Sequence, residues 1–451
     1  MKKIIFTSLL LPACFALAAQ NTGRSAYFID NSLQRHKLNP AYGSVKKYFG
    51  LGVGNTDMDL HSNMGAGTFL YPDSKGGLNL FLSEKVSASD FMSNISEKNT
   101  LNLDMNLSIL SMGFKGRSRE RFTSFDISMR SITGINLPGD LFSFMKEGKA
   151  NRLYDLSDMT IKNQEMLQVS FGYSLDITDK IRAGLKLKGL MGIVQASTKI
   201  EKLQLKLSDS EWLVDAEAEL TGSAKMLEIP TKNEGAYNDI VDWDRIKFKD
   251  FSPAGFGAAL DFGVNYKPVD FVVLSAAVVD LGAINWNKNF RATLGGHWSY
   301  KGFENISAEK SMDEQIEASL KELEEIFKMH KKDYNQNAFE PIPVTINGGV
   351  QVYVPGTGLS AGFLYTRRFD GLLSWEEYRT SANLSLGKWF GISTGYAFST
   401  FGNSFACALN LNVPGIAFSL SLDSIPSKFS KQFIPVSKAM VGLNFGLCIA
   451  W

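Results

Sequence analysis

Cysteine and histidine are scarce in this chain, which has three cysteines and four histidines among 451 residues. Only Cys407 and Cys448 follow the N-terminal segment. Cys407 alternates in step with the apolar residues of its expected strand, whereas Cys448 alternates in step with the small and polar residues of its own. Their side chains should point to opposite sides of a sheet, so we expect no disulfide. The histidines are far apart and show no ligand spacing, so we expect no metal site and no cofactor. They are His36, His61, His297 and His330.

Net charge and long apolar runs are also lacking. The formal net charge is +1, which gives no reason to expect nucleic acid as a partner. Beyond the N-terminal segment there is no run of about 18 apolar residues, so we expect no membrane-spanning helix. A soluble chain of this length would suggest two or three domains, and one large β-barrel is the exception to that rule.

The N-terminus has the pattern of a secretory signal peptide. Lys2 and Lys3 precede an apolar run, and small residues suited to cleavage follow it. The run is too short for a membrane span, so we expect cleavage at about Ala19 and assign residues 1–19 to the signal peptide. A lipoprotein signal at Cys14 is the alternative.

The last thirteen residues alternate between apolar residues and small or mildly polar ones. A period of two indicates a strand, and an apolar face ending in an aromatic residue is typical of a lipid-facing barrel strand. An ordinary strand of a β-sandwich is the alternative. The stretch resembles the outer-membrane assembly signal of bacterial barrels, which implies outer-membrane lipid and the barrel assembly machinery as partners. The residues that carry this resemblance are Phe445, Leu447, Ile449 and Trp451.

Alternating segments of about ten residues recur along most of the chain. In one of them Phe125, Ile127 and Met129 share a face, with polar residues between them. So many segments, joined alternately by short and long connections, favour an antiparallel barrel with short periplasmic turns and long outer loops. We expect an all-β fold, a single transmembrane antiparallel β-barrel of about 14–16 strands over residues 55–451. The lower count applies if a hairpin at 199–227 lies outside the wall.

One stretch has helical periodicity instead. Ser311 and Glu314 form a capping box, and an apolar stripe follows through Leu320, Leu323 and Phe327. We therefore expect an amphipathic helix of about five turns in an outer loop. Its apolar face should pack on the barrel rim, with partner binding as the alternative.

The segments Ser25-Ala-Tyr-Phe-Ile-Asp30 and Leu38-Asn-Pro-Ala41 resemble a Bacteroides-type family of outer-membrane β-barrel proteins with no assigned function. Other resembling pieces, such as Gly67-Thr-Phe-Leu-Tyr-Pro72 and Gln432-Phe-Ile-Pro-Val436, extend over nearly the whole chain. The Asn-Pro-Ala motif is distantly similar to the long-chain fatty acid transporter superfamily, whose N-terminus forms a hatch inside the barrel. These resemblances imply the cell outer membrane of a Gram-negative bacterium and supply no catalytic residue.

Residues 20–54 lack clean alternation and carry charges that a lipid-facing wall would not tolerate. Inward residues of the late strands are small, including Gly395, Ala397 and Ala406, and so leave volume in a lumen that side chains alone would not close. We expect this segment to form a hatch that gates the lumen. A disordered periplasmic tail before an open pore is the alternative. The candidate hatch residues are Arg24, Asp30, Arg35, His36, Asn39 and Pro40.

Polar residues in phase with the inner face form the candidate lumen site. A charge on the lipid face near the midplane costs about 2–4 kcal/mol, so these side chains should face the lumen. Pairing within a plugged lumen and lining of a substrate path both remain open. The residues are Asp126, Arg130, Arg182, Lys186, Lys188, Asp261, Asn265, Asn410, Asn412 and Asn444.

Two serine motifs, at residues 358–362 and 391–395, match the nucleophile-elbow pattern. That elbow needs a strand, a sharp turn and a helix, whereas both motifs lie inside alternating segments, so we expect no enzyme activity. Two functions remain open. One is a gated channel for uptake of a small hydrophobic ligand. The other is a non-conducting structural or accessory barrel of an envelope or secretion assembly.

Overall fold

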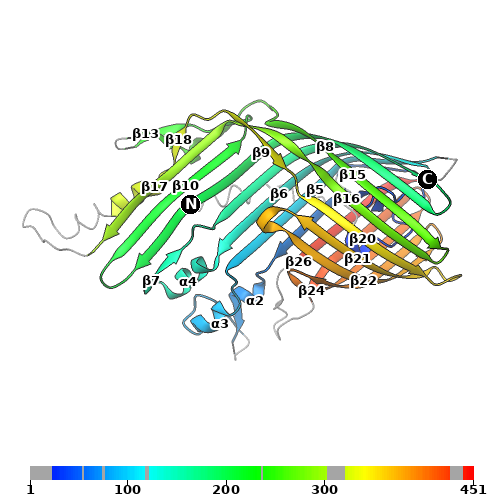
Figure 1. The fold of residues 1–451 in the computed structure, drawn as a ribbon, viewed down its shortest axis with the longest axis horizontal. Coiled ribbons are helices and arrows are strands. Elements are labelled where there is room, and N and C mark those ends of the chain that lie inside the picture. Colours follow the sequence, from blue (N-terminus) through cyan, green and yellow to red (C-terminus); the bar gives the residue numbers. More distant parts are fainter. Residues whose placement is uncertain are drawn as a thin grey trace, which may run out of the picture.

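The computed structural model describes residues 23–52, 55–73, 77–116, 121–234, 237–301, 320–426 and 440–451. The chain forms a closed antiparallel β-barrel of 14 strands with few helices (Figure 1). The predicted all-β barrel is confirmed, at the lower end of the expected strand count. The predicted signal peptide lies outside the described residues and stays a prediction.

Each strand of the wall is hydrogen-bonded to two neighbours, and the last strand closes the ring on the first. Tyr48 pairs with Ala450 at this closure. The backbones of Lys47 and Trp451 exchange two further hydrogen bonds, of 3.1 and 3.0 Å. In order, with the first two forming one interrupted strand, the wall consists of β1 (Tyr48–Leu51), β2 (Asn55–Ser62), β5 (Lys98–Lys115), β6 (Phe122–Pro138), β8 (Thr160–Asp176), β9 (Ile181–Leu207), β15 (Gly255–Val269), β16 (Val272–Lys288), β20 (Val344–Tyr353), β21 (Leu359–Phe369), β22 (Trp375–Leu386), β23 (Phe390–Ser399), β24 (Gly402–Val413), β25 (Ile416–Pro426) and β26 (Met440–Ala450).

The two faces of the wall differ because the sequence alternates. Phe171 and Leu187 point outward and are 52% and 57% exposed, whereas their neighbours Ser170 and Lys186 point inward and are buried. An apolar outer surface around a polar interior is typical of a membrane β-barrel. Within the described ranges, no helix has the length and apolar character needed to cross a membrane. The proposed assembly-signal residues also lie on the outer face, and their role stays a prediction; they are Phe445, Leu447, Ile449 and Trp451.

The connections at one end of the barrel are short turns, whereas the opposite end has all the long connections together with two short ones, at residues 370–374 and 400–401. Short turns join β8 to β9, β15 to β16, β20 to β21, β22 to β23 and β24 to β25. The connections at the other end carry α2 (Ala66–Phe69), β3 (Leu70–Pro72), β4 (Leu78–Leu80), α3 (Ala88–Met92), α4 (Gly139–Glu147), η4 (Trp243–Arg245) and, in a short connection, η5 (Gly371–Leu373). The aromatic side chains of Phe81, Phe91 and Phe142 pack together in one cluster of this end.

A sheet extends beyond the wall from the long strand β9, which has 27 residues. Its second half pairs with β10 (Trp212–Ser223), and β10 pairs in turn with β17 (Phe290–Tyr300) (Figure 1). The hairpin at 199–227 therefore lies outside the wall, which explains the count of 14. The shorter strands are β7 (Ala150–Asp155), β11 (Leu227–Glu228), β12 (Thr231–Glu234), β13 (Tyr237–Val241), β14 (Lys247–Phe248), β18 (His330–Lys332) and β19 (Gln336–Pro341).

Residues 320–326 are helical and follow β17 in a long connection. The side chains of Leu323 and Phe327 pack with Val214 and Trp298 of the extending sheet. A helix in this long connection is confirmed for this part, and that it lies outside the cell stays a prediction. Its apolar stripe packs on β10 and β17 of the extending sheet instead of the expected barrel rim. The proposed cap at Ser311 lies outside the described residues.

Candidate functional site

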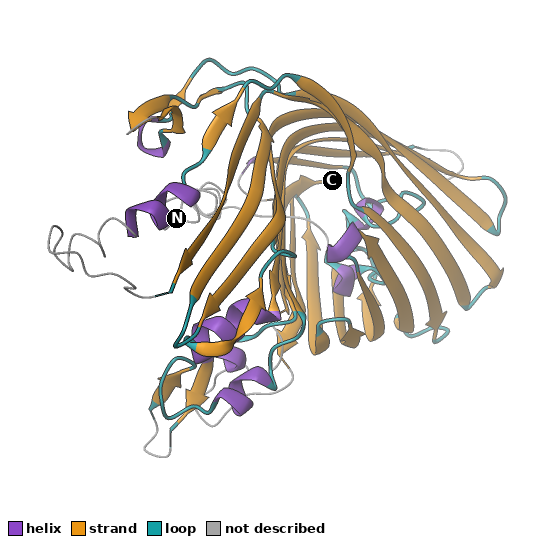
Figure 2. Cartoon of the chain, turned by 60° about the vertical axis from the view of Figure 1, so that its left-hand side comes forward, coloured by secondary structure: helices purple, strands orange, loops and turns teal. Residues whose placement is uncertain are grey.

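The hatch, defined from here on as residues 23–47, lies inside the curved wall (Figure 2). It contains two 3-10 helices, η1 (Arg24–Ala26) and η2 (Arg35–Lys37), and most of its residues are buried. The following residues, Tyr48–Leu51, belong to the wall as β1. The expected boundary at residue 54 is therefore wrong by several residues. A strand of four residues is too short to show a period of two in the sequence.

Inward side chains of three wall strands donate hydrogen bonds to backbone carbonyls of the hatch. The pairs are Gln351 to Phe28 (2.9 Å), Asn347 to Leu38 (2.9 Å), Asn412 to Asn31 (2.7 Å) and Arg182 to Ala41 (2.6 Å). The Asn39 side-chain amide also donates to Asn265 Oδ1, at 3.0 Å. A buried carbonyl that loses its partner costs about 1–3 kcal/mol, so these bonds fix where the hatch sits.

Inward-facing glycines leave space for the hatch against the wall. A side chain at Gly362 would collide with the ring of Phe28, and a side chain at Gly184 would collide with the carbonyl of Pro40. Gly348 of β20 lies between the inward-facing Asn347 and Gly349 and so faces outward, where a Cβ would meet no described atom within 4 Å apart from its chain neighbours. The inner surface of the wall is thus complementary in shape to this segment of the chain.

His36 is buried between the hatch and the wall. Its Nε2 lies 2.6 Å from the Tyr48 hydroxyl, and its Nδ1 lies 3.3 Å from Lys186 Nζ. Burial, followed by the charges of Lys186 and Lys37, holds the pKa of His36 well below its ordinary value of 6.5, against the opposing charge of Asp126. The imidazole is therefore neutral at pH 7 while the hatch is docked.

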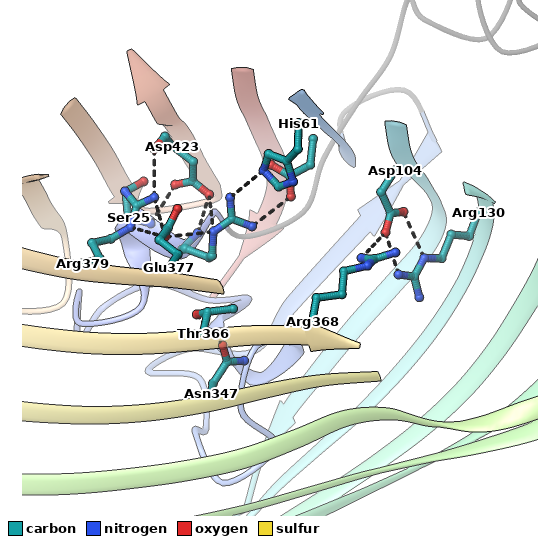
Figure 3. A network of polar contacts seen from close by, with 12 residues as sticks. Ser25, His61, Asp104, Arg130, Asn347, Thr366, Arg368, Glu377, Arg379 and Asp423 are labelled. Carbon is teal, nitrogen blue, oxygen red and sulfur yellow. Dashed lines mark hydrogen bonds and ion pairs between the residues drawn. The ribbon is translucent and has the colours of Figure 1, made fainter. Parts of the chain in front are cut away.

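Arg24 lies in an acidic cradle, defined as Asp59, Glu377 and Asp423. Figure 3 shows two of its members, Glu377 and Asp423, side by side. The Arg24 guanidinium is 3.2 Å from Asp59 Oδ2 and 3.3 Å from Glu377 Oε1, and it lies 5.0 Å from the centroid of the Trp375 ring. The Asp423 carboxylate accepts hydrogen bonds from the backbone N–H groups of Arg24 and the next residue, at 2.7 and 2.8 Å. These contacts attach the start of the hatch to β2, β22 and β25.

A layer of ion pairs links six wall strands across the lumen. Asp104 is shared by Arg130 and Arg368, with N–O distances of 2.7 and 2.6 Å (Figure 3). Buried charges are costly unless they are paired, and each charge here has an opposite neighbour. The members of this ion-pair layer are Arg368, Asp104, Arg130, Asp280, Lys188 and Asp261.

Asp280 owes its position to a bulge in β16, where the register with β15 shifts. Among the described residues it is the only non-glycine residue with a positive φ, which is 64°. Its backbone N–H donates to Asp261 Oδ1 at 2.8 Å, and its carboxylate contacts Arg130 at 2.6 Å. A bulge re-aims a side chain, and this one places a carboxylate in the lumen that strict alternation does not predict.

Two cavities adjoin inside the barrel. A charged cavity of about 150 Å³ is bordered by Arg24 of the hatch, by Asp59 and by members of the ion-pair layer. An apolar cavity of about 510 Å³ lies toward the long-connection end. Asp370 borders both. The apolar cavity is lined mainly by Pro341, Ile342, Pro343, Phe369 and Leu373, and Lys162 also borders it.

The ten lumen candidates all lie on the inner face of their strands, and they fall into three groups. Five contact hatch residues directly: Arg182, Lys186, Asn265, Asn412 and Asp126. Asp126 pairs with Lys37 of the hatch at 4.0 Å and with Lys186 at 3.2 Å, while Arg130, Lys188 and Asp261 belong to the ion-pair layer. The other two, Asn410 and Asn444, are buried on β24 and β26.

The sequence reasoning missed several charged residues of the site. Asp104, Glu377 and Arg368 follow the inner phase of β5, β22 and β21, so the alternation that identified the other residues could have found them. Asp280 carried no such signal, because the bulge changes its phase.

The two serine motifs have no catalytic geometry. Ser360 and Ser393 lie within β21 and β23, so neither is at a strand–turn–helix elbow. In the part of the chain that the structure describes, no group of three or more histidine, cysteine, aspartate or glutamate residues is placed to hold a metal ion.

The fold and the site together define a class: a β-barrel with an apolar exterior whose lumen is filled by its own N-terminal segment. Within that class the chain belongs to the family of unknown function DUF5723, which matches residues 40–423. The predicted resemblance to a barrel family with no assigned function is confirmed.

Two similar solved structures are both barrels. The toluene transporter TbuX of Ralstonia pickettii shares 10% identity over 97% of this chain and 98% of its own, with a TM-score of 0.41. A FadL homologue of Pseudomonas aeruginosa shares 9% identity over 96% of this chain and 97% of its own, with a TM-score of 0.37. At these scores neither similarity bears on the function of this chain. No curated protein matches it.

Proposed function

We propose that this protein is a gated outer-membrane channel of a Gram-negative bacterium, with the hatch as its gate. The observation that carries the proposal is the position of residues 23–47, which fill a closed 14-strand barrel and bind its inner wall. A barrel of this size has a lumen wider than its own side chains fill, so a channel needs an added element to close it. The apolar outer surface supports the membrane location, with lipid as the surrounding partner.

The ligand in this proposal is a small molecule with a hydrophobic body. The apolar cavity of about 510 Å³ supports this choice, because it lies toward the long-connection end and is formed mainly by proline, aliphatic and phenylalanine side chains. Apolar pockets with a few polar groups are the usual form of small-molecule sites. Here Lys162 and Asp370 are those polar groups, and their charged atoms lie 4.0 Å apart.

One observation favours the second candidate, a non-conducting structural barrel. The ion-pair layer links six strands across the lumen, and a path through it must separate paired charges or pass beside them. A barrel that never conducts would have the same layer as a brace. The two functions differ in what happens when the hatch is removed.

Deletion of residues 24–45, with the N-terminal 23 residues kept, tests the gate. The deletion removes the partners of Gln351, Asn347 and Arg182 but leaves β1 and the wall intact. In planar bilayers the intact protein should be quiet and the deleted protein should conduct steadily. Deletion of residues 320–326, in the outer helix, is the matched control and should stay quiet.

Two results would contradict the gate. One is an intact protein that already conducts like an open porin, with no change on deletion. The other is a folded deletion variant that stays closed, which would favour the structural barrel. For the ligand, protein purified in mild detergent should carry a small apolar molecule detectable by mass spectrometry.

A further inference from the structure

We propose that the acidic cradle is a recognition site for a cationic group, and that the hatch closes the channel by filling this site with its own Arg24. A ligand with a guanidinium or ammonium head would then compete with Arg24 and release the start of the hatch. This inference rests on the proposed function, since it names the ligand class and the trigger of the same gate.

The cradle has the chemistry of a complete cation site. Two of its carboxylates, Glu377 and Asp423, have side chains that are only 1% and 2% exposed. Together with Asp59 they surround one guanidinium, and the Trp375 ring adds a cation–π contact from another side. Guanidinium groups match carboxylates and aromatic faces in geometry as well as charge, which suits this arrangement.

Two acceptors in the cradle are left over, Asp59 Oδ1 and Glu377 Oε2. Oε2 of Glu377 is fully buried and has no hydrogen-bond partner among the described residues, while Oε1 serves both Arg24 and Arg379. A buried carboxylate oxygen without a donor is costly, so the site has capacity for more N–H groups than Arg24 supplies. A free ligand cation with several donors can use these oxygens, whereas the tethered Arg24 does not.

Charge explains why only a cation can open the gate. With Arg24 in place, the three carboxylates face two cations, Arg24 and Arg379. If Arg24 leaves alone, the two buried carboxylates and the partly buried Asp59 face Arg379 only, and uncompensated buried charge is strongly destabilising. If a ligand cation takes its place, the charge balance is unchanged. The exchange therefore favours cationic ligands over neutral ones of the same shape.

The cradle can be reached from the ligand's side. Arg24, Asp59 and Trp375 all border the charged cavity, and this cavity adjoins the apolar one at Asp370. A molecule with a cationic head and an apolar body fits this arrangement, with its head in the charged cavity and its body in the apolar one. The charged cavity is lined by aspartates as well as by arginines and lysines, and once Arg24 is displaced the aspartates outnumber the cations, which suits the head. The apolar walls of the other cavity suit the body.

Binding to an emptied cradle is the first test. In the full-length folded protein, Arg24→Ala should create a site for methylguanidinium that binds at least tenfold tighter than in wild type, measured by calorimetry. Methylurea, its neutral isostere, should not bind. Arg24→Ala combined with Glu377→Gln should lose the gain. The matched control is Arg35→Ala, another hatch arginine, which pairs with Asp30 at 3.2 Å outside the cradle and should create no site.

Release of the intact hatch is the second test. Butylguanidinium should speed hydrogen exchange in hatch peptides of the wild-type protein, and butylurea should not. If a folded Arg24→Ala or Arg24→Gln variant binds methylguanidinium no better than wild type, or if methylurea binds equally, the inference is overturned. Failure of the gate leaves a different pattern: methylguanidinium still binds the emptied cradle, but no variant changes conductance.

Discussion

At single positions, the phase of a residue along its strand decides whether its side chain faces the outside or the lumen. Leu187 and Lys186 are neighbours in β9, yet one is exposed and the other is buried beside His36. All ten predicted lumen residues could be identified in this way, because a one-residue slip would put charges into lipid. Their partners could not be predicted. The pairing of Arg130 with Asp104 and Asp280 joins residues far apart in the sequence, and only the closed barrel brings them together.

A charge on the outer face should be costly at mid-height and tolerated near the rim. Leu187 lies six residues along β9 from its start at Ile181, which puts it roughly at the middle of a membrane band about 25 Å tall. Leu187→Arg should lower the free energy of unfolding from lipid vesicles by about 2–4 kcal/mol, and Ile177→Arg in the adjoining turn by about 0–1 kcal/mol. Denaturant titration followed by tryptophan fluorescence measures both. Equal effects at the two positions would count against the membrane placement.

Docking of the hatch should weaken in acid because of His36. In the free hatch His36 should have its ordinary pKa of 6.5, whereas docking holds this pKa well below that value. The docked state therefore binds fewer protons than the free state. The contribution of neutral His36 to hatch docking is fully present above pH 6.5 and is lost as the pH falls below it. The docking equilibrium constant then decreases by at most tenfold per pH unit. Hydrogen exchange of hatch peptides, corrected for intrinsic rates, should show falling protection between pH 7.5 and 5.5. His36→Gln should remove most of this dependence, and an unchanged slope in that variant would exclude His36 as the cause.

Among the elements, the wall strands were predictable and the departures from the wall were not. Alternation identified β5, β6, β8 and the strands of the second half, because lipid outside and a polar lumen inside impose a period of two. The same period continues along β9 past the wall, because its outer half packs one apolar face on Trp298 and the helix after β17. Sequence alone therefore left the count between 14 and 16. The short strand β1 was assigned to the hatch for the opposite reason, that four residues show no period.

The two ends of the barrel should differ in access from outside the cell. Strand directions put Lys321 in a long connection and Asp270 in a short turn at the opposite end. In a background with Cys407→Ser and Cys448→Ser, Lys321→Cys should react with an impermeant maleimide on whole cells. Asp270→Cys should react only after the outer membrane is opened. The reverse pattern would invert the orientation.

At the scale of the whole molecule, two structures occupy the lumen of the barrel, and each brings together residues that are distant in the sequence. The hatch comes from residues 23–47, and its place in the wall is prepared by inward glycines and amides of β9, β20, β21 and β24. The ion-pair layer then links six strands beside it. The presence of an inner segment could be predicted from its charges and from the small residues of the late strands. Its exact path could not, because it depends on which wall positions lack a side chain.

The most direct test of the account is the conductance of a protein whose hatch is complete but cannot dock. Gly362→Leu places a side chain where the Phe28 ring lies, whereas Gly348→Leu on the neighbouring strand adds the same side chain on the outer face, away from the hatch. Both variants should fold, as judged by heat-modifiable migration. In planar bilayers Gly362→Leu should show steady ion conductance, and Gly348→Leu should be as quiet as the wild type. Two folded variants with the same conductance would contradict the claim that the docked hatch closes this barrel.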